Sequence, residues 1–346
     1  MAGPRLGQGL PGAEHRRRLR RVRAAAAGAQ DLRRRWIGDV GRAEGHDGLA
    51  VLATVGPTAA QAIAAAAFVP DEQIAGDKAE VSLLLPPGVE SHSFEPRPGD
   101  IVRISKADLF IYTGPLMEPW VEDILKGVTN KELIVINASA NIQLANEDQQ
   151  DHDHPAGEYT HDHEHEHSGQ DPHIWVDPVL AQQIVSTIAD GFTAKDPANK
   201  DFYLANAKTY NEKLAALDSQ IRATLEKCRN KTIVYGGHFA FGYFARRYGL
   251  EHLSPYAGFS PNAEPTPKKI TEMIETLKKA DTSYIYYEEL LEPRVARIIA
   301  EGAGAKLLLL HGAHNISKQE LDKGVTYLEI MEGNLERLKL GLGYQD

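Results

Sequence analysis

The chain has 346 residues, enough for two or three domains of ordinary size. Its 38 lysines and arginines against 48 aspartates and glutamates leave a net charge of −10, which argues against nucleic-acid binding by the whole molecule. The single cysteine, Cys228, excludes an intramolecular disulfide and a zinc site built from thiolates. The 14 histidines are spread unevenly, and this uneven distribution is the first indication of function.

Residues 1–70 are predicted to be a leader, disordered or signal-like, ahead of the folded domains. Arginine runs occur within residues 16–23 and 33–35, with little apolar periodicity around them. From Gly48 to Pro70 no residue is charged, and the stretch is rich in alanine. Three interpretations stay open for it: a signal-peptide core, a poor membrane span, or the opening strand and helix of the domain that follows.

From residue 71 onward, short apolar runs alternate with helical stretches, which is typical of parallel α/β sheets. The runs expected to be strands are Val81–Leu85, Asp108–Tyr112, Leu133–Asn137 and those that begin at Thr232, Ser283 and Lys306. Because these runs are continuously apolar, they suit strands that are buried on both faces.

A long helix is expected to interrupt this alternation between Tyr203 and Cys228. Its apolar residues recur at steps of three or four: Leu204, Ala207, Tyr210, Leu214, Leu217, Ile221 and Leu225. We therefore expect two parallel-sheet α/β lobes, residues 71–197 and 230–346, joined by one long rigid linker helix at residues 198–229. The alternative is a long surface helix of a single larger domain.

An acidic, histidine-rich tract occupies Asp151–Gln170. Its histidines are His152, His154, His161, His163, His165 and His167. Such a tract cannot bury a core, and its imidazoles and carboxylates predict an auxiliary loop that captures metal ions. The alternative is an ordinary solvated loop.

Four further histidines are expected near the ends of predicted strands: His92, His173, His238 and His311. A lone histidine in such a place is usually a polar loop residue. Ligands of open α/β sheets bind at the carboxyl ends of the strands, however, so four histidines there can converge on one cleft. The sequence therefore predicts a metal site made of these four side chains.

Three neighbouring residues are alternative or supporting members of this site. His314 lies three residues after His311 and could take its place. Glu288 and Glu289 end the run that begins at Ser283, and they could ligate the ion or orient a ligating imidazole.

Imidazole nitrogens suit zinc, copper, nickel and iron, whereas manganese prefers more oxygen. Three or four histidines therefore favour Zn²⁺ over Ni²⁺ or Mn²⁺. A zinc-dependent hydrolase or lyase, with Glu288 or Glu289 as general base, is one alternative function, although no HExxH motif occurs. A surface protein active in cell adhesion, or a metal buffer, is another.

Five segments together resemble the zinc/manganese solute-binding proteins of bacterial ABC importers, and their histidines resemble the zinc-uptake branch. These segments are VSLLLPPGVESHSFEPRPGD, ADLFIYTGPLMEPW, DPHIWVDP, GGHFAFGYFARRYGL and TYLEIMEGNLERLKLGL. The resemblance implies two α/β lobes joined by a long helix, with the metal in the interlobe cleft. It also implies a periplasmic or otherwise extracytoplasmic protein that delivers zinc to a membrane permease. We expect a monomer and no enzymatic activity.

The resemblance also assigns the ligands. His92 matches the first, in an H-x-F-E-P motif, and His173 matches the second, in D-P-H-I-W. His238 matches the third, where manganese-type members often carry glutamate. The fourth is usually an acid in the last strand-end loop, and here His311 is the nearest equivalent.

Overall fold

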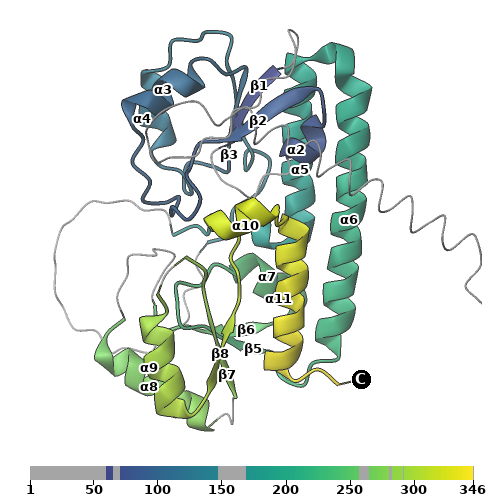
Figure 1. Cartoon of the computed structure of the whole chain (residues 1–346). Helices are drawn as coiled ribbons and strands as arrows, with labels where there is room; N and C mark the ends of the chain where they lie inside the picture. The colour runs from purple at the N-terminus through teal and green to yellow at the C-terminus, as the bar shows by residue number, and fades with distance from the viewer. Residues whose placement is uncertain are drawn as a thin grey trace, which may run out of the picture. The chain divides into compact units, whose positions relative to one another are not determined.

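The computed structural model describes residues 60–64, 71–146, 169–256, 265–279, 283–290 and 292–345 (Figure 1). The predicted auxiliary loop histidines, His152 to His167, lie outside these ranges. Within the described ranges, no helix combines the length and the apolar character that crossing a membrane requires.

The first sheet has four parallel strands in the order β2-β1-β3-β4. They are β1 (Ala60–Ala64), β2 (Ala79–Leu83), β3 (Leu109–Tyr112) and β4 (Ile134–Asn137). On β3, Leu109 and Ile111 belong to one core cluster, while Phe110 belongs to a second cluster on the opposite face. Helix α5 (Pro178–Lys195) covers the first face, and α3 (Pro98–Ile104) and α4 (Val121–Lys126) supply the second cluster. The sheet is thus buried on both faces, as its apolar runs predict.

Strand β1 corrects the predicted start of the first lobe. It lies inside residues 1–70, the range predicted to be a leader, yet it pairs with β2 on one side and β3 on the other. Of the three interpretations of the alanine-rich stretch, residues 60–64 therefore support the opening strand of the domain. Without this strand the sheet would be divided between β2 and β3, so the lobe begins before residue 71.

The second sheet repeats the strand order of the first. Its strands are β5 (Thr232–Val234), β6 (Glu251–Leu253), β7 (Tyr284–Tyr287) and β8 (Lys306–Leu309). Parallel pairs β5-β6 and β7-β8 are joined by a bridge between Tyr235 and Tyr286, where Gly236 N–H donates to the Tyr286 carbonyl at 2.8 Å. The order β6-β5-β7-β8 places a switch in strand order between β5 and β7, and ligands of such sheets bind at the carboxyl ends beside this switch.

Two helices cover one face of this sheet, and others close the opposite face. Val234 and Ile285 pack with α8 (Pro267–Lys279) and α9 (Arg294–Ala303) in one cluster. Ile233 and Tyr286 face the other way, into the large core that includes α7 (Gly242–Tyr248) and α11 (Tyr327–Leu342).

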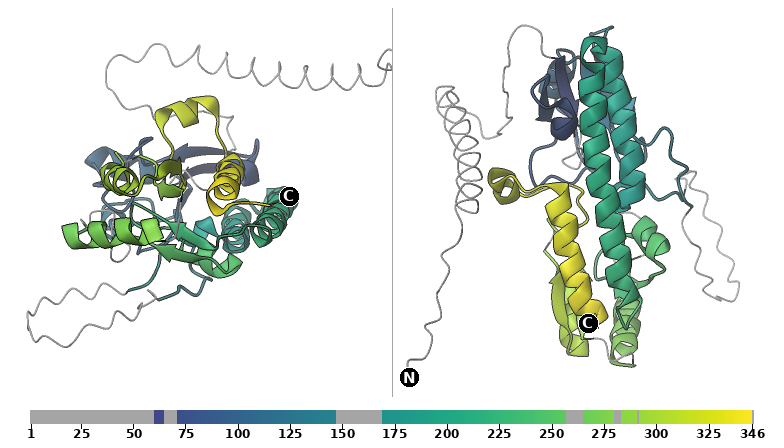
Figure 2. Two further views of the ribbon diagram at one scale, coloured as in Figure 1. Left: turned by 90° about the horizontal axis from the view of Figure 1, so that it is seen from below. Right: turned by 90° about the vertical axis from the view of Figure 1, so that its right-hand side faces the viewer.

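The long helix α6 (Lys200–Glu226) confirms the predicted helix with a shift of two or three residues. It packs against α5 and α2 (Asp71–Ala75), and towards its C-terminus against α11 (Figure 2). Its buried face includes Tyr203, whereas Leu204 is 38% exposed, which corrects one residue of the predicted stripe. That α6 acts as a rigid linker stays a prediction.

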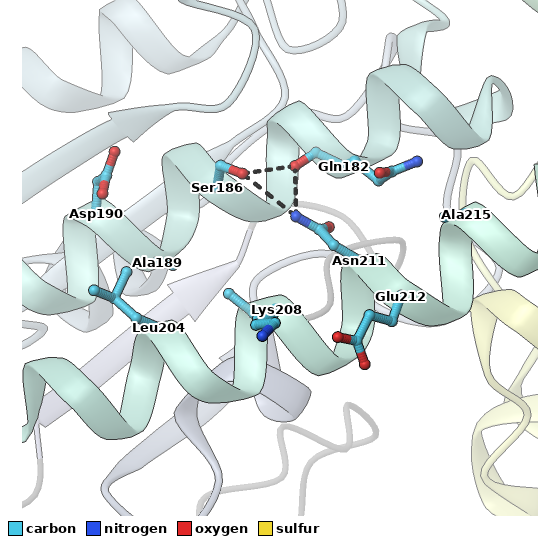
Figure 3. A pocket seen from close by; sticks show the side chains of 10 residues that line it. Gln182, Ser186, Ala189, Asp190, Leu204, Lys208, Asn211, Glu212 and Ala215 are labelled. Atoms are coloured by element: carbon cyan, nitrogen blue, oxygen red, sulfur yellow. Dashed lines mark hydrogen bonds between the residues drawn. The ribbon is translucent and has the colours of Figure 1, made fainter.

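A groove of about 440 Å³ lies between α5 and α6 (Figure 3). Polar side chains and alanines line it together, and Asn211 Nδ2 donates across it to the Gln182 carbonyl at 3.3 Å. The described residues that line this groove include no histidine, so it is separate from the predicted metal site.

Candidate metal centre

Three of the four predicted ligands meet. His92, His173 and His238 each offer one ligand atom, and these atoms lie within 4.8 Å of one another. The Nε2 atoms of His92 and His173 are 3.4 Å apart although the residues are 81 positions apart in the sequence. His173 and His238 are buried, and His92 is partly exposed. Side chains from both halves of the chain therefore converge on one point.

His314 is the fourth imidazole beside this group. Its ring centroid lies 6.5 Å from that of His92, 5.2 Å from that of His173 and 5.1 Å from that of His238. Its Nε2 is buried and has no hydrogen-bond partner among the described residues. A buried ring nitrogen that has no hydrogen-bond partner and lies beside three other imidazoles is well placed to bind a metal ion.

His311, the predicted fourth ligand, is held elsewhere. Its backbone exchanges two hydrogen bonds of 2.8 Å with the Asn334 amide, and its Nδ1 accepts from Ala313 N–H at 3.0 Å. Its Nε2 lies 3.4 Å from Glu320 Oε1, on α10 (Lys318–Lys323). The structure does not bring His311 into the group of three, because hydrogen bonds with Asn334 and Ala313 hold its backbone and its ring.

Carboxylates approach the Nδ1 atoms of three of the clustered imidazoles. Asp171 Oδ1 lies 2.8 Å from Nδ1 of His173 and also accepts its backbone N–H at 3.0 Å. Glu288 Oε2 lies 2.6 Å from Nδ1 of His238. Glu289 Oε1 lies 3.2 Å from Nδ1 of His314. A carboxylate at Nδ1 favours the proton there and leaves Nε2 free for a metal.

Asp171 was missed from the sequence. It lies two residues before His173 in D-P-H, and this spacing lets one carboxylate oxygen reach both the backbone N–H and the ring of the histidine. Glu288 and Glu289 lie where an orienting role was predicted. Which of these side chains touch the ion stays a prediction.

Burial keeps two imidazoles uncharged. It lowers the pKa of His92 to about 4, with nearby His314 and His238 adding to the effect against the opposing charge of Glu90. Burial and the same neighbouring imidazoles lower the pKa of His173 well below its ordinary value. Both rings are therefore neutral at pH 7, the form that binds a metal.

At His314 the Glu289 carboxylate opposes the effect of burial. Burial alone would lower the pKa of His314, but its hydrogen bond to Glu289 and the charge of that residue raise it. Burial would likewise raise the pKa of Glu289, yet the hydrogen bond from His314 and the charges of His311 and His314 bring it down to about 2. Glu289 is thus an ionised carboxylate inside the protein.

Backbone strain occurs at the same place. Among the described residues, the non-glycine residues with positive φ are Leu290, at 67°, and Ala313, at 55°. Leu290 follows Glu289, and Ala313 precedes His314. Left-handed backbone is costly for residues with a Cβ and persists where the surrounding contacts impose it. The two strained turns thus adjoin Glu289 and His314, which contact each other.

Trp175 ties two segments of the site together. It lies in a short 3₁₀ turn, η1 (Ile174–Val176), and its Nε1–H donates to the Gly312 carbonyl at 2.8 Å. Its ring centroid is 5.4 Å from that of His173 and 5.6 Å from that of His314. The segment that carries His173 is therefore bonded directly to the loop that carries His314.

The comparisons with known proteins agree with this geometry. Residues 68–341 match the family model described as zinc-uptake complex component A, periplasmic. The chain belongs to this ZnuA family. It is 41% identical over 268 residues to the high-affinity zinc uptake system protein ZnuA of Bacillus subtilis, covering 78% of this chain and 82% of that one. The ZnuA family consists of solute-binding proteins of zinc importers and not of enzymes, so the hydrolase alternative falls.

Two further relatives support the assignment to the ZnuA family. The chain is 36% identical over 272 residues to the zinc-binding protein AdcA of Streptococcus pyogenes, covering 77% of this chain and 52% of that protein, so it spans about half of AdcA. The Zn(II)-bound ZnuA-like domain of Streptococcus pneumoniae AdcA shares the fold with a TM-score of 0.67 and 31% identity, covering 82% of this chain and 99% of that domain. The two-lobe α/β fold expected from the sequence is confirmed.

Proposed function

We propose that this chain captures Zn²⁺ with the imidazoles of His92, His173, His238 and His314 and delivers it to the permease of an ABC importer. The observation that carries this proposal is the cluster itself, in which three ligand atoms lie within 4.8 Å and a fourth ring adjoins them. Family membership supports the transport role.

The donor set favours zinc over the other metals considered. Four imidazole nitrogens can form the tetrahedron that zinc prefers, with Zn–N distances of about 2.0–2.1 Å. Manganese prefers carboxylate and water oxygens, and the carboxylates here approach Nδ1 atoms on the outer side of the rings. Zinc should therefore bind far more tightly than manganese, and nickel should be the stronger competitor.

The three carboxylates also supply the charge that the ion needs. A divalent cation among four neutral rings would carry an uncompensated charge inside the protein, which is costly. Asp171, Glu288 and Glu289 lie one imidazole away from the ion and offset that charge. None of their oxygens has to coordinate the ion for this.

The choice between His314 and His311 has a direct test. His314→Ala should lower zinc affinity by more than tenfold, and X-ray absorption of the loaded variant should lose one nitrogen ligand. His311→Ala changes the same loop and serves as the matched control, with a smaller loss and an unchanged nitrogen count. The reverse order of effects would restore His311 as the fourth ligand.

Delivery to a permease is tested in cells. A strain that lacks the gene should grow poorly when zinc is limiting, and the intact gene should restore growth. A copy with His92, His173 and His238 all changed to alanine should not. Normal zinc uptake without the protein would favour the adhesin or metal-buffer alternative.

Two further expectations have tests of their own. Edman sequencing of the protein recovered outside the cytoplasm tests the extracytoplasmic location. Light scattering tests whether the protein is a monomer.

A further inference from the structure

A buried asparagine joins the loops that follow β2 and β8. Asn315 is 1% exposed, and its Nδ2 donates to the Pro86 carbonyl at 2.9 Å and to the Val89 carbonyl at 2.8 Å. Beside it, Gly88 N–H donates to the Ile316 carbonyl at 2.8 Å. Three hydrogen bonds thus connect segments more than two hundred residues apart in the sequence.

The direction of the Asn315 amide is well defined. Its Oδ1 accepts the N–H of Ile316 at 2.8 Å, and both hydrogens of Nδ2 go to the other loop. A flipped amide would set the oxygen against two carbonyls, which is repulsive. Gly88 has a φ of 82°, a backbone conformation that side chains disfavour, so the opposite loop is also shaped for this contact.

Each of the two loops carries one of the proposed ligands. His92 lies three residues after Val89, and His314 immediately precedes Asn315. The Glu90 carboxylate accepts the N–H groups of His92 and Ser93, at 3.1 and 3.0 Å, so the segment from Val89 to His92 is held as one turn. A displacement of that turn would carry His92 away from the other rings.

The loop that carries His92 is the part of the site best placed to open. His173 and His238 are 0% and 2% exposed, and each has a carboxylate at Nδ1, whereas His92 is partly exposed. Zinc must shed ligands to leave, and His92 is the ligand nearest solvent.

We propose that Asn315 latches the loop of His92 to the loop of His314 and so sets how fast zinc enters and leaves. This inference rests on the proposed zinc site. The latch joins protein to protein and does not touch the ion, so it stabilises the closed site with and without zinc. Its loss should therefore speed entry and exit together, with little change in the equilibrium affinity.

The test measures zinc exchange in the full chain with Asn315→Ala. Release into excess chelator, followed by stopped flow, should be about tenfold faster, because the two hydrogen bonds from Asn315 Nδ2 to the loop of His92 are lost. Association should accelerate similarly, and Kd should stay within about threefold. Asn130→Ala is the matched control: Asn130 also bridges backbone groups, donating to Ala107 O at 2.7 Å and accepting from Glu132 N–H at 2.9 Å, yet it touches neither loop.

Two results would overturn the latch. One is zinc release from Asn315→Ala within twofold of the wild-type rate. The other is faster release with an unchanged association rate, which would indicate that Asn315 has only a structural role. Failure of the wild-type protein to bind zinc would overturn the proposed function instead. If Asn315→Ala does not fold, hydrogen exchange of the wild-type Gly88 amide decides. Bound zinc holds both loops and should slow this exchange at least tenfold. Equal rates with and without zinc would show that the latch opens independently of zinc release, which contradicts the proposal.

Discussion

Glu288 and Glu289 are adjacent in the sequence, yet each approaches a different imidazole. Glu288 Oε2 lies 2.6 Å from Nδ1 of His238, and Glu289 Oε1 lies 3.2 Å from Nδ1 of His314. Successive residues of an extended chain point to opposite sides, and both follow directly after β7. The end of one strand therefore places carboxylates beside rings that come from two other segments.

Glu289→Gln should weaken zinc binding by about 10- to 100-fold, the usual effect of removing a carboxylate that orients a metal-bound histidine. The amide cannot supply the negative charge that balances the ion, and it holds the His314 ring less firmly. Competition with a fluorescent chelator measures the affinity. Glu301→Gln, at an exposed position on α9, is the control and should bind as the wild type does. Equal affinity of the two variants would count against the role of Glu289.

Trp175 should report zinc binding through its fluorescence. Its ring lies 5.4 and 5.6 Å from two of the proposed ligands, so a cation between them changes its surroundings. Trp175→Phe should abolish most of the zinc-dependent change in emission. It should also lower affinity about fivefold or more, because the hydrogen bond to Gly312 is lost. Unchanged affinity and a full fluorescence response in the variant would contradict both roles of Trp175.

His173→Ala should reduce zinc affinity far more than removal of the histidine-rich tract does. The deletion should span residues 151–168, because Asn146 pairs with Gln170, and Asp171 N–H donates to the Ala145 carbonyl at 2.9 Å. Calorimetric titration of both variants measures the difference. Similar binding curves would contradict both the assignment of His173 as a ligand and the assignment of the tract as an auxiliary metal-binding loop.

Gly236→Ala should destabilise the second sheet and the site together. A Cβ at Gly236 would lie 2.4 Å from Cβ and 2.6 Å from Cα of Ala296, on α9, and these atoms cannot turn aside. We expect a loss of about 1–3 kcal/mol in the free energy of unfolding. Zinc affinity should fall as well, since His238 follows two residues later. Gly99→Ala, where no atom lies within 4 Å of the new Cβ, should leave both quantities almost unchanged.

Glu118 should make stability depend on pH. Burial raises its pKa to about 7 from an ordinary 4.5, against hydrogen bonds from Gly114 and Thr113 that lower it. The folded state therefore holds a proton that the unfolded chain loses, and stability falls as the pH rises from about 4.5 to about 7. A shift of this size corresponds to a free energy on the order of 3 kcal/mol.

Denaturation of zinc-free protein across this pH range tests the prediction. Glu118→Gln removes the titrating group, so the difference in unfolding free energy between wild type and variant should change by a few kcal/mol between pH 4.5 and 7.5. Glu122→Gln, at an exposed position nearby, should follow the wild type. Parallel curves for wild type and Glu118→Gln would show that this carboxyl titrates normally.

The regular elements with strong local patterns were predictable. The apolar runs became β2, β3, β4, β5, β7 and β8, and the three- and four-residue spacing became α6. Strand β6 was missed because it has three residues, Glu251–Leu253, and no apolar run. The ring of its His252 stacks on Phe239 with a centroid distance of 3.9 Å. Strand β1 stayed ambiguous because an alanine-rich stretch suits several structures equally.

His92, His173 and His238 could be selected from the sequence, since the motifs that contain them and the order of those motifs are visible in one chain. The sequence could not separate His311 from His314, three residues apart on the same loop. Tertiary contacts decided their positions. Hydrogen bonds with Asn334 and Ala313 hold His311, while the hydrogen-bond contact with Glu289 holds His314 beside the cluster. A ring turns towards the partners that distant segments bring to it, and those partners exist only once the chain has folded.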